Sequence, residues 1–491
     1  MGRNCREEYH SLLKNFRSSP LFLYTFIFVA GIIFAGIFPS GTNYSILFST
    51  TTFLILIVLY YLSYTETMAA RGTKDYSQFL KISVFFAFFA LGILSITLNG
   101  YYNNIHRNSR IPSLKPHLDT CLITETPKLT GKFMKFPAKS AKYNESILIF
   151  INKDIYCNDY EIGDSLITII KSIPLEEKKS KKNFDNTRYL KEKGIYSTAF
   201  ISGGRVIVKK LSKPDIKYRI LRFRDRSINI MEKKINNPEI HSTLVALTTG
   251  VKTYLSDDIR KSFSKSGTMH LLAVSGLHVG FIYSVLLFIT SIFGNFTSSV
   301  FARSVFVIIL LWGYALFTGM APSIERAVLM ATIYQIGTIF GKKRNSLNSL
   351  SLSALIICIF DPGAVFDVGF QLSYAATLSI ILINPVINKW YQTKNPIMKY
   401  IWTTVSISTS CQIGTSILTI YHFKFIPVYF MISNLLAIPL SSIIISTTMI
   451  LVVAGDSGIS VLLVPVLKFL VRMLNESMAI ISTLPYPVIE F

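Results

Sequence analysis

The sequence predicts a polytopic α-helical membrane protein into which an extracytoplasmic all-β domain is inserted. First, 51% of the 491 residues are hydrophobic and only 16% are charged, with a mean hydropathy of +0.45, a balance that soluble domains of this length do not show. Second, apolar runs of about 18 to 22 residues recur along the chain, long enough to cross a hydrocarbon core, and predict about ten or eleven spans. Third, one long polar region rich in β-branched residues interrupts them.

Three predicted spans, at residues 21–38, 45–64 and 79–98, make up an N-terminal membrane region of residues 1–99. The segment before the first span is basic, but two further apolar runs follow at once, so it predicts an anchor and not a cleaved leader. The loop before the third span is also basic, whereas the loop PSGTNY is uncharged. Because cytoplasmic loops are enriched in Lys and Arg, we expect a cytoplasmic N-terminus, and three crossings place the following region outside.

Residues 100–236 are predicted to form a basic extracytoplasmic β domain. β-Branched runs such as SILIFINKDIYC and DSLITIIKSI are broken by Gly, Pro, Asn and Asp, a pattern typical of small barrels and sandwiches. Residues 100–239 contain 28 Lys or Arg against 15 Asp or Glu, in a chain of formal net charge +23. This charge favours a polyanionic partner, either nucleic acid or anionic lipid headgroups. The general basic bias of membrane proteins is the competing explanation of the net charge.

Cysteine and histidine usage indicates one candidate disulfide and no metal site. Cys121 and Cys157 are the only cysteines of the β domain, and pairing is favoured in an oxidising compartment. The seven histidines contain no HxH, HxxxH or HExxH pair, and the five cysteines contain no CxxC. The sequence therefore predicts no metal ligand set and no cofactor site.

The second half of the chain divides into two predicted regions. Residues 237–267 have apolar residues at helical spacing and are expected to form amphipathic interfacial helices. Residues 268–491 contain a further series of apolar runs, which predicts a membrane channel domain. If its first span runs inward, these basic residues fall on the cytoplasmic side, as the positive-inside rule requires: Arg303, Lys342, Lys343, Arg344, Lys389, Lys394 and Lys399. The last run contains Lys468 and Arg472, so the side of the C-terminus stays open.

Polar residues recur at the ends of these apolar runs and inside them, often beside Gly or Pro. Such groups cost a few kcal/mol each in a bilayer, so they usually face a water path or a partner. Broken helices are tolerated at membrane depth only against protein or a water-filled cavity. We therefore expect a polar path, with hydrogen bonding between helices and a structural ion pair as the alternatives for individual residues. The candidates are His270, Ser275, Gly276, His278, Glu325, Arg326, Asp361, Asp367, Gln371, Ser373, Gln412, Asn434 and Pro439.

Ser275 and His278 also allow a chemical interpretation. They are three residues apart, so they share one face of a continuous helix, and a serine activated by a histidine is the minimum of a hydrolase dyad. The sequence marks no oxyanion hole and no orienting acid. An intramembrane serine hydrolase is therefore the alternative to a transport function.

Several of these strings, in this order, resemble the ComEC family of DNA-uptake proteins of natural competence. HLLAVSGLHVG at residues 270–280 is similar to the most recognisable string of that family. GMAPSIERAVLM, DPGAVFDVGFQLSYAAT, the segment around Gln412 and NLLAIP follow in the family's order. In the β domain, NFDNTRYLKEKGIYSTAFI resembles a segment of the family's external OB-like domain. The resemblance covers nearly the whole chain.

The resemblance implies a channel in the cytoplasmic (inner) membrane that passes single-stranded DNA inward, with the external OB-like domain receiving it. OB barrels bind single strands with basic grooves and exposed aromatics. Aromatics interleave with Lys and Arg in this domain at Tyr143, Tyr156, Phe184, Tyr189, Phe200 and Tyr218. The DNA-binding candidates are Lys181, Lys182, Arg188, Tyr189, Lys191, Arg205, Lys209, Lys210, Lys213 and Lys217.

The chain departs from many members of that family in one respect. It contains no HxHxDH, so we expect a form without the C-terminal metallo-β-lactamase-like domain, and no enzymatic activity is assigned. It contains no Walker motif either. The expected partners are single-stranded DNA, membrane lipids, a DNA receptor, a separate nuclease, a cytoplasmic ATP-driven translocase and further copies of the chain. A small-molecule transporter is a third alternative, although no pair of repeated halves is evident.

Overall fold

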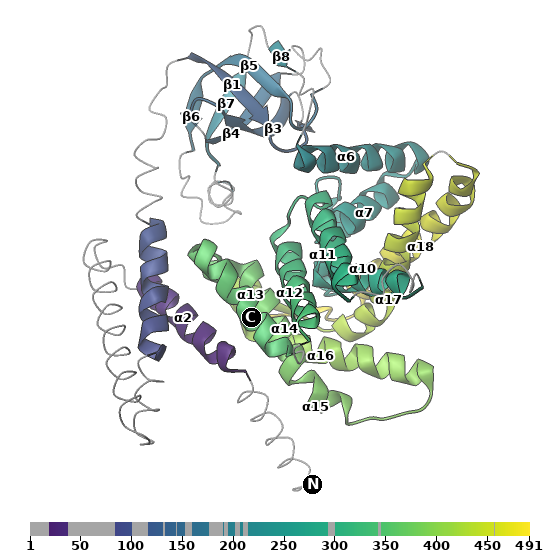
Figure 1. Cartoon of the computed structure of the whole chain (residues 1–491). Coiled ribbons are helices and arrows are strands. Elements are labelled where there is room, and N and C mark those ends of the chain that lie inside the picture. The colour runs from purple at the N-terminus through teal and green to yellow at the C-terminus, as the bar shows by residue number, and fades with distance from the viewer. Residues whose placement is uncertain are drawn as a thin grey trace, which may run out of the picture. The chain divides into compact units, whose positions relative to one another are not determined.

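The computed structural model describes residues 19–37, 84–100, 116–130, 133–143, 145–152, 160–175, 190, 195–201, 207–209, 215–292, 300–341, 345–455 and 457–491. The chain is mostly helical and contains one larger β-sheet (Figure 1). It divides into two compact units. One contains the sheet and comprises residues 103–229, and the other comprises residues 1–102 and 230–491. The predicted span at residues 45–64 lies outside the described residues.

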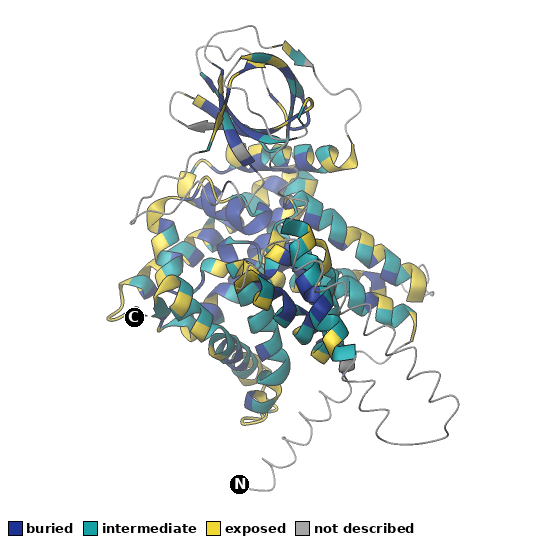
Figure 2. Cartoon of the chain, turned by 90° about the vertical axis from the view of Figure 1, so that its left-hand side faces the viewer, coloured by how far each residue is buried: buried dark blue, intermediate teal, exposed yellow. Residues whose placement is uncertain are grey.

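The sheet unit contains eight described strands in the order β6-β7-β4-β3-β1-β5-β8, with β2 paired to β3. The strands circle a common interior (Figure 2). β4 and β7 run parallel, and the other pairs are antiparallel. The bounds are β1 His117–Ile123, β2 Lys128–Thr130, β3 Phe133–Ser140, β4 Ser146–Asn152, β5 Ser165–Ile170, β6 Ser172–Pro174, β7 Ile195–Ile201 and β8 Ile207–Lys209. The β-branched runs thus form the predicted strands.

Apolar residues at alternate positions along these strands form the core of the sheet unit. In β4, Ile147, Ile149 and Ile151 are fully buried and pack with Cys121, Phe136 and Leu166 of neighbouring strands. Period-two alternation places such residues on one face of a strand, so the residues between them point outward. Cys121 is a free, buried thiol, and burial, together with Asp119, raises its pKa to about 12. Cys157 lies outside the described residues, so the disulfide stays a prediction.

The all-β expectation for residues 100–236 is wrong at its C-terminal end, where helix α6 spans Ile216–Lys234. Its buried positions Leu221, Arg224, Ile228 and Met231 recur every three or four residues. This spacing is helical and could have been read from the sequence. Five of the first eleven residues of α6 are Lys or Arg, and these charges hid the apolar pattern.

The helical unit consists mainly of long apolar helices. The described part of the chain contains three that are long and apolar enough to cross a membrane: α11 Val300–Phe317, α17 Phe430–Ala454 and α18 Gly458–Thr483. Shorter apolar helices occupy Leu21–Ile37, Val84–Gly100, Gly276–Ile292, Ser346–Phe360 and Val368–Leu382. The remaining helices of eight or more residues are α7 Pro238–Thr249, α8 Asp257–Lys265, α12 Pro322–Ile339 and α16 Pro396–Phe423. Short elements include α9 Met269–Leu272, η2 Pro362–Phe366, α15 Asn384–Asn388, and the paired strands β9 Phe425–Pro427 and β10 Val488–Glu490.

The predicted pair of amphipathic helices is half correct. Helix α8 has a polar surface and buries only Ile259 and Phe263, as expected of an amphipathic helix. Helix α7 differs, because every residue from Ile240 to Thr249 is buried. It contacts α9, α17 and α18, and its Ser and Thr side chains are buried with the apolar ones. Helix α7 is therefore a core element of the helical unit and not an interfacial one.

Candidate functional site

The quoted string HLLAVSGLHVG folds as the short helix α9, a turn, and the start of α10, which spans Gly276–Ile292. His270 lies on α9, and Ser275 directly precedes α10. The backbone N–H of Ser275 donates to Nδ1 of His278 over 3.1 Å, and the Ser275 hydroxyl lies 3.2 Å from the same nitrogen. His278 is the third residue of the helix, where a side chain can accept from the N–H that precedes the helix. The histidine therefore caps α10.

This cap weakens the hydrolase interpretation. A general base must have a free lone pair toward the serine hydroxyl. The Nδ1 lone pair of His278 already accepts the backbone N–H, and His278 is fully buried, with no partner for Nε2. The contact is explained by the geometry of a helix start, and none of the residues that the structure describes offers a carboxylate to the ring as a hydrogen-bond partner. The geometry thus favours a structural role for Ser275 and His278.

The start of α12 packs against this turn. The Ser323 hydroxyl donates to the Val274 carbonyl over 2.9 Å, and a Cβ built at Gly276 would lie 3.6 Å from Cβ of Ala327. Val274 and Val279 pack with Ile324 in one apolar cluster. The start of α10 therefore packs directly against the helix that contains Glu325 and Arg326, and a methyl group at Gly276 would fit there at ordinary van der Waals distance.

Arg326 is a buried cation between α12 and α14, which spans Val368–Leu382. Only 6% of its surface is exposed. Its Nη2 donates to the Gly369 carbonyl over 2.9 Å, whereas its Nε has no hydrogen-bond partner. The Asp367 carboxylate caps α14 by accepting from the N–H groups of Gly369 and Phe370. Since a buried charge is costly unless it is paired, the half-satisfied guanidinium makes Arg326 the strongest candidate among the predicted site residues.

A third contact links α14 to the end of α16. Gln371 donates through Nε2 to the Val365 carbonyl over 3.0 Å, and its Oε1 lies 3.1 Å from Nε2 of His422. His422 is the residue that the sequence interpretation missed. It stands in the last turn of α16 among apolar and aromatic residues, and no motif marks it. Its partner Gln371, by contrast, belongs to a recognisable string.

The contacts of Arg326 and Gln371 join α12, α14 and α16, and Ser323 joins α12 to the turn before α10. We name the set Ser275, His278, Arg326, Asp367, Gln371 and His422 the polar line. The other predicted residues are placed differently. Asp361 accepts from the Gly363 N–H at the start of η2, and Asn434 of α17 donates to Ser408 of α16 over 3.3 Å. Gln412 stands in the middle of α16, Pro439 lies inside α17, and Glu325 and Ser373 lie on α12 and α14 beside residues of the polar line.

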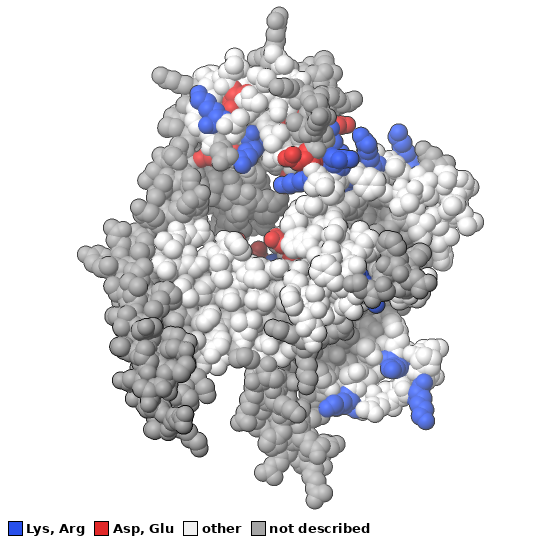
Figure 3. All heavy atoms as spheres, viewed as in Figure 1, with Lys and Arg blue, Asp and Glu red and all other residues white. Residues whose placement is uncertain are grey.

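Most of the predicted DNA-binding residues lie outside the described residues: Lys181, Lys182, Arg188, Tyr189, Lys191, Arg205, Lys210 and Lys213. Lys209 ends strand β8, and Lys217 is exposed on α6. Lys and Arg side chains line α6 in the space-filling view (Figure 3). The described part of the chain contains no group of three His, Cys, Asp or Glu side chains that could hold a metal ion.

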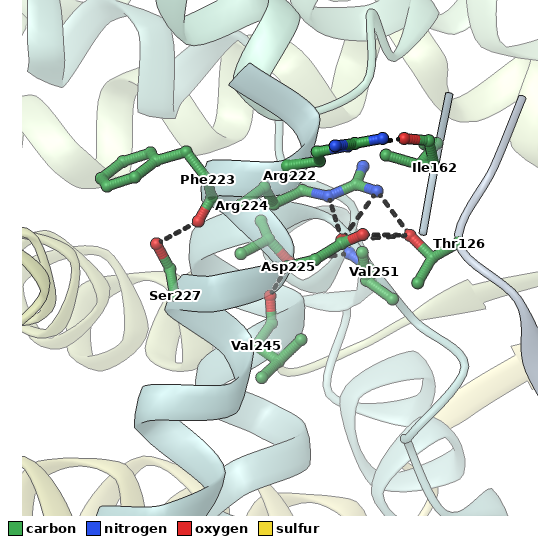
Figure 4. Close-up of polar contacts among 10 residues, drawn as sticks. Thr126, Ile162, Arg222, Phe223, Arg224, Asp225, Ser227, Val245 and Val251 are labelled. Carbon is green, nitrogen blue, oxygen red and sulfur yellow. Dashed lines mark hydrogen bonds and ion pairs between the residues drawn. The ribbon is translucent and has the colours of Figure 1, made fainter. Parts of the chain in front are cut away.

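Two arginines of α6 serve the fold of the sheet unit (Figure 4). Arg222 contacts the loop before β5 three times: Nε donates to the Ile162 carbonyl over 2.9 Å, Nη2 lies 2.9 Å from buried Asp164, and Nη1 lies 3.1 Å from Glu161. Arg224 donates to the Thr126 hydroxyl over 3.0 Å, and that hydroxyl also contacts Asp225. The exposed cations of α6 within this unit are Lys217, Arg219 and Arg226.

Sequence comparisons agree with this organisation. The family model described as "Competence protein" matches residues 247–491, which contain the whole polar line. ComE operon protein 3 of Bacillus subtilis (strain 168) is 26% identical over 422 residues, or 84% of this chain. The chain belongs to the ComEC family of competence proteins. This ComEC-family chain spans 48% of the length of the Bacillus relative.

A second relative is more distant. An uncharacterised protein of Aquifex aeolicus (strain VF5) is 24% identical over 162 residues, which is 33% of the ComEC-family chain and 38% of the relative. No solved structure matches the chain. Membership of the family therefore rests on the sequence matches, and the geometry above is that of the chain itself.

Proposed function

We propose that this chain is a channel in the cytoplasmic membrane that passes single-stranded DNA inward during competence. The observation that carries the proposal is the polar line, centred on the buried and half-satisfied cation Arg326, within helices that are otherwise apolar. Ionisable residues inside apolar helix bundles usually mark an ion or substrate path. An arginine with a free N–H donor suits the phosphates of a nucleic acid strand.

The surface of the helical unit supports a membrane location. Large apolar side chains are exposed on its helices, among them Phe360 at 85%, Ile417 at 79% and Val453 at 85%. Exposed apolar area of this extent is unfavourable in water and suits a hydrocarbon environment. A cytoplasmic N-terminus and an external sheet unit are part of the proposal, and the distribution of Lys and Arg among the loops supports them.

The strand order supports an OB fold for the sheet unit. β1, β3 and β4 form an antiparallel meander, β7 lies parallel to β4, and β5 with β6 bridges β1 to β7, separated only by Lys171. This pairing pattern supports the proposal of an OB-like barrel, a fold that binds oligonucleotides. We propose that the unit receives the single strand before transport. The nuclease and the ATP-driven motor are assigned to partner proteins.

The proposal is tested with the full chain in a planar lipid bilayer, where an applied voltage drives a single-stranded oligonucleotide into an open pore. We expect ion conductance and transient current blocks by the oligonucleotide. Arg326→Gln removes a charged donor in the path and should shorten the blocks by roughly 10- to 100-fold. Arg326→Lys keeps the charge and should retain much of the block duration.

Arg303→Gln is the matched control. Arg303 also lies in an apolar helix, α11, but its guanidinium donates to Thr290 and to the Leu287 carbonyl, away from the polar line. Its replacement should leave the blocks unchanged. An absence of conductance from the wild-type chain, or equal effects of the two glutamine variants, would contradict the proposal.

A further inference from the structure

Four residues form one row across the outer face of the sheet unit. The register pairs Lys135 of β3 with Phe150 of β4, and Phe150 with Phe200 of β7. Lys171 directly precedes Ser172, which pairs with Ala199, so the antiparallel register places Lys171 beside Phe200. The row therefore runs from Lys135 on β3 to Phe150 on β4 and Phe200 on β7, and ends at Lys171, the residue before β6. Figure 1 labels these four strands.

The two rings of this row face outward and stack on each other. Their neighbours along the strands, Ile149, Ile151 and Ala199, are fully buried in the core, so alternation turns Phe150 and Phe200 to the opposite side. On that side Phe150 is half-buried, because it packs against the small apolar cluster of Leu148, Leu190 and Ile195, whereas Phe200 is exposed. The ring centroids are 4.8 Å apart, with an interplanar angle of 13°. Lys135 Nζ lies 5.7 Å from the centroid of Phe150.

A third ring extends the row. Phe133 lies two residues before Lys135 on the same face of β3, and its ring meets Phe200 edge-on at a centroid distance of 6.3 Å. Phe200 is 46% exposed and Phe133 is 39% exposed. Cross-strand aromatic pairs stabilise sheets, but that effect requires neither open ring surface nor a lysine at each end of the row. The combination instead matches a surface that stacks bases and contacts phosphates.

We propose that Phe133, Phe150 and Phe200, flanked by Lys135 and Lys171, form a stacking platform for the bases of an unpaired nucleic acid strand. This inference rests on the proposed function of the sheet unit as the DNA receiver. A single strand exposes the faces of its bases, whereas a duplex hides them in its own stack, so the platform selects single strands. The lysines contact the phosphates on either side of the stacked bases.

The test uses the full chain in detergent with a tryptophan placed on the platform. In Phe200→Trp, stacking of a thymine base should quench the new indole emission when oligo(dT) is added. An abasic oligonucleotide of equal length and charge should leave the emission unchanged. Ile207→Trp is the matched control, because Ile207 is an exposed apolar residue, 59% accessible, on β8, which pairs with β5 and with none of the strands of the row. Equal quenching at both positions, or quenching by the abasic strand, would overturn the platform.

Affinity gives the second measurement. Phe200→Leu keeps an apolar side chain but removes the ring, and we expect oligo(dT) binding to weaken roughly 5- to 100-fold, the range for loss of one base-aromatic stack. Ile207→Ala, on β8, should bind as the wild type does. If wild-type and Phe200→Leu chains bind oligo(dT) equally with a steep salt dependence, the platform is wrong while the DNA-receiving role stands. If the wild-type chain does not bind oligo(dT) at all, both proposals fail.

Discussion

His278 is the residue for which the structure and the sequence suggest the most different roles. Its Nδ1 accepts a hydrogen bond from the Ser275 N–H, so the imidazole caps the N-terminus of α10. In this arrangement it does not activate the serine as a nucleophile. Glutamine at this position can also reach back to that N–H. We therefore expect His278→Gln to keep most of the thermal stability of the chain.

His278→Leu provides the contrast. It leaves the Ser275 N–H without its acceptor, so we expect a loss of about 1 to 3 kcal/mol of unfolding free energy, seen as a lower melting temperature in detergent. Current blocks by oligonucleotide should persist in His278→Gln. A serine hydrolase would lose its turnover in both variants alike, and that result would contradict the capping role.

At the scale of elements, α14 and α16 pack closely against each other at Gly414. A Cβ built there would lie 1.6 Å from Ser379 Oγ and 3.1 Å from the Ala375 carbonyl oxygen. Gly414→Ala must therefore separate the helices or displace Ser379, which should cost about 1 to 3 kcal/mol and disturb the contact between Gln371 and His422.

Gly337 of α12 is the matched site, because a Cβ there meets no atom within 4 Å. Gly337→Ala should be neutral or slightly stabilising, since alanine favours the helix. Gly414→Ala combined with Ser379→Gly should recover part of the lost stability, because the nearest obstacle is then removed. Thermal unfolding of the three variants provides the measurement, and equal melting temperatures for both alanine variants would count against close packing at Gly414.

The elements also show what the sequence can and cannot predict. The β-branched runs became strands, because alternation in segments such as SILIFIN is a local property. The burial of α7 was not predictable in this way, since α17 and α18 cover it from more than 180 residues further along the chain. The same holds for the contact of Gln371 with His422, which joins two helices 51 residues apart. Motif strings predicted Arg326 as a candidate, but only the fold reveals its partner, Gly369.

At the scale of the whole molecule, each unit presents one surface that bears on the proposal. In the sheet unit, α6 exposes Lys217, Arg219 and Arg226, whereas the helical unit exposes many large apolar side chains besides Lys389, Lys394 and Lys399 (Figure 3). A polyanion binds the first kind of surface with a steep salt dependence, and lipid suits the second. This division fits a protein that captures DNA in water and passes it through a membrane.

The most direct test of the account is a photocrosslink from the polar line to a DNA strand stalled in the channel. A single strand bearing streptavidin at its trailing end is driven by voltage into the full chain, which has a photoreactive benzoylphenylalanine in place of Gln371. The control has the same residue in place of Ile417, which is 79% exposed on the outer surface of α16. The account predicts a crosslink from position 371 and none from position 417. Crosslinks from position 417 alone, or from both positions equally, would contradict it.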